Sequence, residues 1–149
     1  MALDFRLAAS AEDEQRILRM DTVCFPLDEP PVIAGAEWFI GCDGSKRVAY
    51  CAWKTVEHDG VPTGFHYRAG VLPEYRGQGL QRQMLRLREP RMREQGLTLA
   101  VTYTDADAAA SMRNLIAEGY RPYAPTPTTT LSGPGRLGRV GFVHWRKSL

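Results

Sequence analysis

Cysteine and histidine are both scarce in this sequence. The cysteines are odd in number and share no C-x-x-C or C-x-x-H pattern; they are Cys24, Cys42 and Cys51. This set argues against a disulfide framework and a zinc site, and reduced thiols fit a cytoplasmic protein. The histidines at positions 58, 66 and 144 form no close pair. We therefore expect no bound metal.

Long apolar runs and a strong charge of one sign are also missing. No uninterrupted apolar stretch approaches the ~18–20 residues of a membrane span. Asp4, Arg6 and the acidic run 12–14 stand where a secretory signal would need apolar residues. The 19 Lys and Arg nearly balance the 17 Asp and Glu. This balance argues against nucleic acid or an anionic membrane as a partner.

What remains is an ordinary globular composition, with 149 residues of which 44% are hydrophobic and 24% charged. This length predicts a single domain over residues 1–149 that needs no disulfide or metal to fold. Apolar spacing and turn residues predict helices over about 11–21, from 80 to Gly96 with a kink or break at Pro90, and from a cap at Asp105 or Asp107 to Gly119. Strands are predicted over 37–41, 47–56, about 63–71, 97–103 and 140–146, with a long loop over 122–141. The order predicts a mixed α/β fold.

A glycine-rich turn, Arg76-Gly77-Gln78-Gly79, joins the strand that ends near 71 to the helix that begins near 80. The first backbone amides of a helix have no intrahelical partner, so such a turn favours an anion. A P-loop is excluded because no Lys-Ser/Thr pair follows the turn. A dinucleotide loop is excluded because Arg82 occupies the position of its third glycine. The turn therefore predicts an anion site of another kind.

Two segments resemble the signatures of the GNAT N-acetyltransferase superfamily. Residues 71–80, V-L-P-E-Y-R-G-Q-G-L, are similar to its acetyl-CoA signature V-x-P-x-x-R-G-x-G, and residues 111–120, S-M-R-N-L-I-A-E-G-Y, to its S-x-R-x-L-x-x-x-G-[FY] helix end. The element order matches over nearly the whole chain. The resemblance implies a mostly antiparallel sheet, splayed at the acetyl-CoA site and flanked by helices. It also implies an enzyme in which a primary amine of a small molecule, protein or peptide attacks acetyl-CoA directly.

The resemblance also assigns residues to a coenzyme site and an acceptor site. It implies that coenzyme A meets Ala69, Gly70, Val71, Arg76, Gly77, Gln78, Gly79, Leu80, Gln81, Arg82 and Ser111. The amide of Val71 is the expected oxyanion donor, and Gly70 suits a bulge that would splay the strands. The acceptor residues implied are Phe25, Asp28, Glu29 and Trp38, whose two carboxylates would attract a cationic amine.

The chain departs from the family pattern at positions where the family usually has its catalytic acid and base. Leu115 stands where a tyrosine often protonates the departing thiolate, and Ala108 and Gln81 replace a usual asparagine and a usual small residue. Tyr67 and Tyr103 are the catalytic candidates, expected on the faces of Ala69 and Val71, with core packing as the alternative. His66 has a better pKa for a base. Simple alternation places it on the other face from Tyr67, which predicts packing or surface exposure.

Three questions stay open at this stage. The missing acid and base motivate an alternative in which the chain binds an acyl-CoA without chemistry, as a sensor or scaffold. A nucleic-acid binder is a weaker alternative, which would use Arg82, Arg86, Arg88, Arg91 and Arg93. Arg76, Arg82, Arg86 and Arg93 are either phosphate ligands or solvated cations. The acceptor and the oligomeric state, monomer or homodimer, are not determined.

Overall fold

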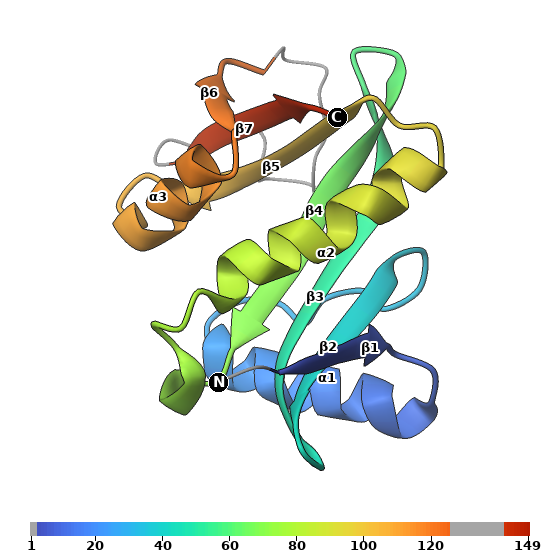
Figure 1. The fold of residues 1–149 in the computed structure, drawn as a ribbon, viewed down its shortest axis with the longest axis vertical. Helices are drawn as coiled ribbons and strands as arrows, with labels where there is room; N and C mark the ends of the chain where they lie inside the picture. Colours follow the sequence, from blue (N-terminus) through green and yellow to red (C-terminus); the bar gives the residue numbers. More distant parts are fainter. Residues whose placement is uncertain (1–2, 126–141) are drawn as a thin grey trace.

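The described strands form one sheet in the order β1-β2-β3-β4-β5-β7-β6 (Figure 1). This computed structural model describes residues 3–125 and 142–149. Neighbouring strands are antiparallel except β4 and β5, which are parallel. The elements are β1 (Asp4–Leu7), α1 (Ala11–Cys24), β2 (Glu37–Asp43), β3 (Lys46–His58), β4 (Val61–Val71), the 3₁₀ helix η1 (Pro73–Tyr75), α2 (Leu80–Glu94), β5 (Leu99–Asp105), α3 (Ala109–Ala117), β6 (Arg121–Tyr123) and β7 (Phe142–Ser148).

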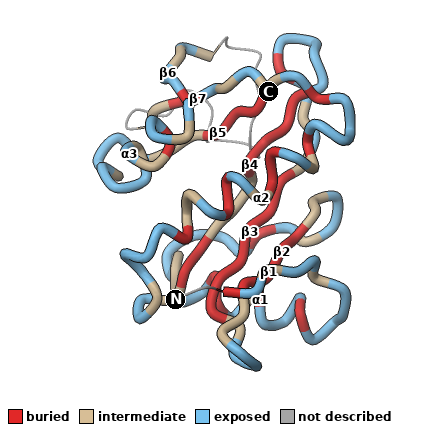
Figure 2. Tube along the Cα trace, viewed as in Figure 1, coloured by how far each residue is buried: buried red, intermediate tan, exposed pale blue. Residues whose placement is uncertain are grey.

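Helices α1 and α2 cover opposite faces of this sheet. Ile17 and Met20 of α1 pack on one side with Tyr50, while Met84 and Met92 of α2 pack on the other side with Val48. Buried residues accordingly run along β3, β4 and β5 behind α2 (Figure 2). The mixed α/β fold predicted from the sequence is confirmed.

Several predicted details are wrong. Pro90 does not interrupt α2, which is continuous from Leu80 to Glu94. No aspartate caps α3: its N-cap is Ala108, and no side chain bonds there. Strands β1 and β6 were not predicted, because four and three residues are too short for an alternation pattern. The rest of the loop predicted over 122–141 lies outside the described residues, apart from 124 and 125.

Strands β4 and β5 begin side by side and then separate (Figure 1). Their parallel pairing covers only Gly64 with Ala100 and Phe65 with Val101. Beyond it, the hydroxyl of Thr102 donates to the His66 carbonyl at 3.2 Å. From there onward β4 turns an open backbone edge toward a gap in the sheet.

A β-bulge lies at Tyr67, not at Gly70 as expected. Trp53 of β3 pairs with His66, and Ala52 pairs with Arg68, so Tyr67 is the extra residue of β4. Gly70 has another role: a Cβ there would lie 2.5 Å from Cε1 of Tyr50. Its lack of a side chain leaves room for that buried ring.

The bulge reverses which side chains share a face of β4. Tyr67 and Arg68 both point to the α1 face, where Tyr67 packs against Trp38. His66, Ala69 and Val71 therefore share the α2 face. The expectation that Tyr67 shares a face with Ala69, and that His66 does not, is wrong because alternation fails across a bulge.

Candidate functional site

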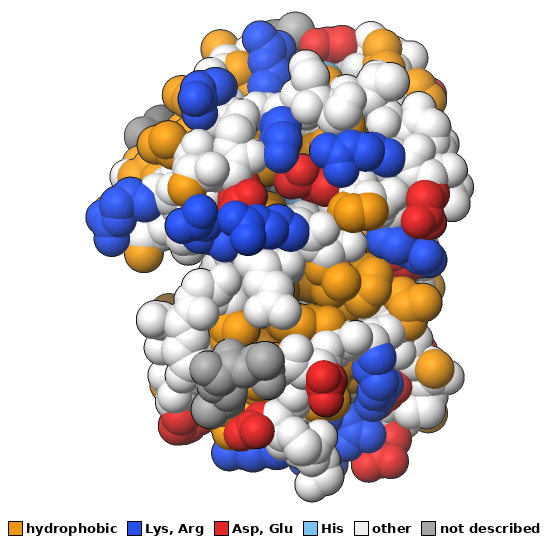
Figure 3. Space-filling model, in the orientation of Figure 1, with side chains coloured by type: hydrophobic (Ala, Val, Ile, Leu, Met, Phe, Trp, Pro, Cys, Tyr) orange, Lys and Arg blue, Asp and Glu red, His pale blue; other side chains and the backbone are white. Residues whose placement is uncertain are grey.

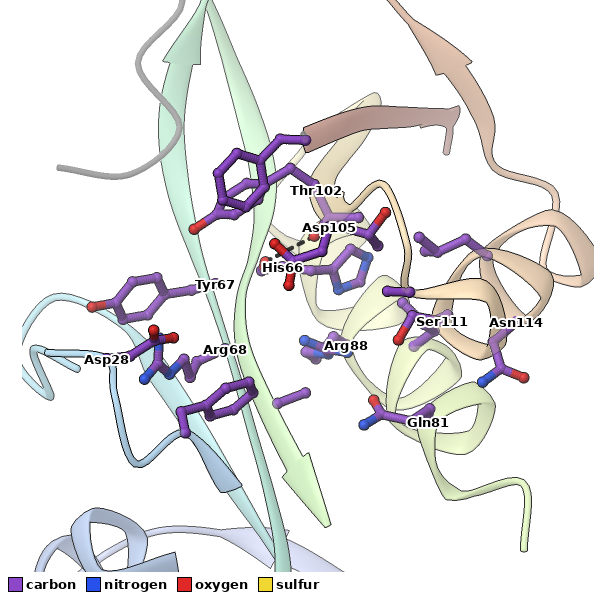
Figure 4. Close-up of a pocket in the computed structure, with 18 residues that line it drawn as sticks. Asp28, His66, Tyr67, Arg68, Gln81, Arg88, Thr102, Asp105, Ser111 and Asn114 are labelled. Carbon is purple, nitrogen blue, oxygen red and sulfur yellow. Dashed lines mark hydrogen bonds and ion pairs between the residues drawn. The ribbon is translucent and has the colours of Figure 1, made fainter. Parts of the chain in front are cut away.

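A cavity of about 480 Å³ opens where β4 and β5 separate (Figure 4). Strands β4 and β5, helices α2 and α3, and the turn after α1 all contribute to its wall. Of the residues predicted for a site, the wall contains Phe25, Asp28, Tyr67, Ala69, Gln81, Tyr103 and Ser111. The structure therefore brings candidates from all three predicted sets into one cavity.

Two predicted acceptor residues lie outside this wall. Trp38 is only 4% exposed; it stacks on Tyr50, and its Nε1 donates to the Ile33 carbonyl at 2.9 Å. It is a core residue, because its position on β2 turns it under α1. Glu29 is exposed and joins the site only through its backbone carbonyl, which accepts from Nη2 of Arg68 at 3.4 Å.

The glycine-rich turn has the backbone shape that its sequence indicates. Gly77 and Gly79 adopt φ values of +78° and +76°, a conformation that glycine reaches without strain. Gly79 is the N-cap of α2, and no side chain caps the helix there. A Cβ on either glycine would meet nothing within 4 Å, so the space beside the turn is open. Nε of Arg76 donates to the Val71 carbonyl at 2.9 Å and ties the turn to the end of β4.

The open edge of β4 presents alternate backbone groups to the gap. The amide of Leu72 bonds the carbonyl of Val48 at 2.9 Å, so Leu72 and Gly70 direct their backbone toward β3. Ala69 and Val71 consequently direct theirs toward the open edge. Because the Val71 carbonyl already accepts from Arg76, the amide is the backbone group of Val71 that stays open to a ligand, beside the backbone of Ala69.

At the α1 side of the cavity, a buried carboxylate holds a guanidinium in place. Asp21 accepts from Nε and Nη2 of Arg68, each at 2.8 Å, and from the Tyr50 hydroxyl at 2.5 Å. Burial works against the charge of Arg68, but the bonds to Asp21 outweigh it and raise the Arg68 pKa. Asp28 lies 3.7 Å from Nη1 of Arg68, so two carboxylates face one guanidinium here. Counted by formal charge, the cluster of Asp21, Asp28 and Arg68 is negative.

Positive charge gathers at the opposite end, over α2 and α3 (Figure 3). Arg82 and Arg86 both bond Glu118, with nitrogen–oxygen distances of 3.2 and 2.9 Å. Burial would raise the pKa of Glu118, but its bonds from Arg86 and Arg82 outweigh burial and lower it. Two cations share one carboxylate, next to the positive end of the α2 dipole. This end favours anions.

A buried hydrogen-bond chain starts at His66 in the inner wall and runs behind it. Nε2 of His66 lies 2.6 Å from the Tyr120 hydroxyl, which also lies 3.2 Å from Oε2 of Glu89. Oε1 of Glu89 accepts from Nζ of Lys147 at 2.6 Å. Nδ1 of His66 is buried with no hydrogen-bond partner among the described residues. Burial first, then the charges of Arg88 and Lys147, hold the His66 pKa well below its usual value.

Arg88 reinforces the same wall. Its side chain is 2% exposed; Nη1 donates to the Ala52 carbonyl at 3.1 Å and Nε donates to the Met84 carbonyl at 3.0 Å. Ala52 faces the β4 bulge, so Arg88 supplies a donor where the strand ladder is irregular. The sequence carried a signal for this position, because Arg88 follows Met84 by four residues and so lies on the apolar face of α2. His66 carried no such signal, since the bulge was not visible in the sequence.

Among the described residues, no group of three or more His, Cys, Asp or Glu side chains is placed to hold a metal ion. No helix in the same residues is long and apolar enough to cross a membrane.

Comparison with known proteins agrees with this architecture. Residues 10–115, more than two thirds of the chain, match the model of the acetyltransferase (GNAT) family. No curated protein sequence matches the chain significantly.

Solved structures share the fold at low sequence identity. The chain resembles one in the NatC complex bound to Gag peptide and CoA, with a TM-score of 0.77, 14% identity, and coverage of 100% of this chain and 99% of that one. It resembles the ribosomal-protein-S18-alanine N-acetyltransferase of Escherichia coli, with a TM-score of 0.70, 16% identity and coverage of 97% and 94%. It resembles an acetyltransferase of Bacillus subtilis in complex with CoA, with a TM-score of 0.74, 13% identity and 99% coverage of both chains. The family match, the splayed sheet and the glycine-rich turn at the start of α2 together show that this chain belongs to the acetyltransferase (GNAT) family.

Proposed function

We propose that the protein transfers an acetyl group from acetyl-CoA to a primary amine that attacks it directly. The observation that carries this proposal is the cavity at the open edge of β4, which lies beside the uncapped N-terminus of α2. An extended arm with a diphosphate at one end suits such a site, because strand edges and helix N-termini offer unpaired backbone groups. The solved relatives that contain CoA or act on alanine support the same reaction class.

The residues present fit acetyl-CoA as a substrate. The amides at the start of α2 and the open space beside Gly77 and Gly79 suit the diphosphate. Ala69 and Val71 suit pairing with the pantetheine arm. Gln81 and Ser111 line the cavity between the two. When bound, acetyl-CoA would supply the activated thioester, and the Val71 amide is the donor that we assign to the developing oxyanion.

The acceptor would enter at the negative end of the cavity. Phe25 and Asp28 line it there, and Asp21 already balances Arg68. A protonated amine is attracted to a site where carboxylates outnumber cations, which concentrates it beside the thioester. Small-molecule amines and peptide amines both fit this description. We also propose that residues 1–149 form a single catalytic domain.

Two measurements test the proposal. Calorimetry should show acetyl-CoA binding in the micromolar range that is usual for enzyme substrates. Thiol release should then exceed the acetyl-CoA hydrolysis background for at least one member of a panel of small amines and peptides. Tight binding of acetyl-CoA with no amine turned over would instead support the alternative of a non-catalytic sensor or scaffold.

A further inference from the structure

The unpartnered nitrogen in the cavity wall calls for an explanation. Nδ1 of His66 is the buried polar atom of the wall that lacks a hydrogen-bond partner among the described residues. Such an atom destabilises the fold when it is left without a partner. His66 lies in the wall between Thr102 and Arg88 (Figure 4). A group inside the cavity is therefore the natural partner of Nδ1.

The hydrogen-bond chain behind His66 determines which ring nitrogen carries the proton. Tyr120 has one hydroxyl proton for two neighbours, Nε2 of His66 and Oε2 of Glu89. Tyr120 donates to Oε2 of Glu89, whose Oε1 accepts from Lys147. Both contacts contain a hydrogen only if Tyr120 donates to Glu89 and Nε2–H of His66 donates to Tyr120. Nδ1 then carries the lone pair of the ring.

We infer that His66 is the catalytic proton shuttle of the proposed reaction, with Tyr120 and Glu89 as the residues that position it. This inference rests on the proposed function. In the step, the nitrogen of a neutral amine bonds to the thioester carbonyl carbon while one of its protons passes to Nδ1. The carbon–sulfur bond then breaks, and the same proton passes from Nδ1 to the leaving sulfur. The imidazole ends neutral, and the products are an amide and a thiol.

The charges around His66 suit this cycle. Burial first, and then the charges of Arg88 and Lys147, disfavour a lasting imidazolium, so the ring is neutral when the amine arrives. Glu89, reached through Tyr120, stabilises the imidazolium while it exists, as a carboxylate behind a catalytic histidine does. Leu115, which is also in the wall, has no proton to exchange. The imidazole of His66 can accept a proton and then release it, so it can serve both transfers.

The chain contains a matched control for this arrangement. His58 and Tyr123 form a second pair, with Nε2 2.8 Å from the hydroxyl, ring centroids 5.5 Å apart and planes at 63°. The corresponding ring values for His66 and Tyr120 are 5.6 Å and 65°. His58 does not line the cavity. Substitutions at His58 and Tyr123 therefore disturb the same kind of contact without reaching the site.

The first test needs no turnover. Nitrogen NMR on the full chain labelled at its three histidines should show His66 protonated on Nε2 and bare on Nδ1. Tyr120→Phe removes the hydroxyl and should allow a mixture of tautomers at His66, whereas Tyr123→Phe should leave His66 unchanged. A proton on Nδ1 of the wild-type protein would overturn the assignment, whether or not any amine is acetylated.

The second test is kinetic, with the amine that the wild-type protein turns over. His66→Asn keeps a polar group near Nδ1 but cannot shuttle a proton, so kcat should fall about 10²–10³-fold while KM for acetyl-CoA stays within about threefold. Tyr120→Phe should lower kcat by about 10–100-fold as the loss of an orienting partner. His58→Asn should leave kcat within about twofold. Unchanged kcat with a raised KM in His66→Asn would make Nδ1 a ligand of the cofactor arm and refute the shuttle.

Chemical rescue separates a proton shuttle from a structural role. His66→Ala should regain activity when imidazoles are added, and the rescued rate should follow their basicity. Equal rescue by imidazoles of different basicity, or by none, contradicts the proposal. Failure of the wild-type protein to acetylate any amine would count against the proposed function itself. In that case the NMR measurement of the His66 tautomer still tests the proposed hydrogen-bond arrangement.

Discussion

Single residues set the chemistry of this cavity through their backbone conformation as much as through their side chains. Gly77 and Gly79 hold the turn before α2 in a left-handed conformation and leave open space beside it. Gly70 makes room for the Tyr50 ring. The sequence pointed to all three glycines, although it assigned the bulge to Gly70 and not to Tyr67. Only the steric environment distinguishes these roles.

The glycine turn gives a prediction at this scale. Gly79→Ala should weaken acetyl-CoA binding at least tenfold, because the new methyl group enters the open space where the diphosphate is proposed to lie. The left-handed conformation also adds about 1–2 kcal/mol of strain. Gly96→Ala is the matched control, since Gly96 has φ +78° and equally open space but lies beyond the far end of α2. Calorimetry should show unchanged affinity in that control; equal weakening in both would trace the effect to strain alone.

Two irregularities of the sheet shape the cavity: the bulge in β4 and the separation of β4 from β5. The bulge in β4 turns His66 into the cavity, and the early separation of β4 from β5 opens it. Helix α2 supports the bulge, because Arg88 bonds the Ala52 carbonyl across from it. The length and apolar face of α2 were predictable from residue spacing. The bulge was not, because an extra residue in a strand leaves no mark in a pattern of alternating side chains.

Arg88 gives the first prediction for an element. Arg88→Met keeps the length of the side chain but leaves the Ala52 carbonyl without this donor, so the free energy of unfolding should fall by about 1–3 kcal/mol. Arg86→Met, on the exposed side of the same helix, loses only a surface ion pair and should cost about 1 kcal/mol or less. Urea titrations of both variants compare the two. If they are equally destabilised, Arg88 does not stabilise the bulge.

Pro90 gives the second prediction for an element, helix α2. It is exposed in the middle of α2, and it deprives the Arg86 carbonyl of an intrahelical donor. Pro90→Ala restores that bond and should raise the free energy of unfolding by about 1–3 kcal/mol. Gln83→Ala, another exposed position of α2, should change it by about 0.5 kcal/mol or less. A destabilised Pro90→Ala protein would show that α2 depends on the proline.

At the scale of the whole molecule, charge is divided between the two ends of the cavity. The α2–α3 end carries two arginines on one carboxylate, and the α1 end carries two carboxylates on one arginine. This polarity suits an anionic donor that enters from one side and a cationic acceptor that enters from the other. The net charge of +2 conceals it. Tertiary packing, which brings Glu118 to α2 and Asp21 to Arg68, creates it.

Acid stability is the prediction for the whole molecule. Burial lowers the pKa of both His66 and His144 in the folded state. Below pH of about 6.5 the unfolded chain therefore binds protons that the folded chain excludes, and the free energy of unfolding should fall by up to about 1.4 kcal/mol per pH unit for each such group. Urea titrations between pH 7 and 5 should show a shallower slope for His66→Asn than for the wild-type protein. An identical slope would mean that His66 titrates normally.

Protonation of the carboxylates causes a second loss of stability at lower pH. Hydrogen bonds from Arg6 hold the pKa of Asp13 well below its usual value, and those from Arg91 lower the pKa of Glu37. A carboxylate with a lowered pKa stabilises the fold above its unfolded pKa of about 4 and loses this contribution as pH falls further. The histidine loss therefore precedes the carboxylate loss during acidification, and the two can be measured separately.

The amino-acid sequence alone was enough to determine the family, the order of most elements and the position of the glycine-rich turn. Each of these depends on residues that are near one another in the chain: apolar spacing, glycine and proline positions, and the ten-residue signature. The hydrogen-bond chain behind the cavity wall was decided by tertiary structure, because His66, Tyr120, Glu89 and Lys147 come from four separate segments and meet only after β4 bulges and α2 packs across it. Local residue spacing carries no information about these contacts, since the contacts depend on which edge of a strand is left open.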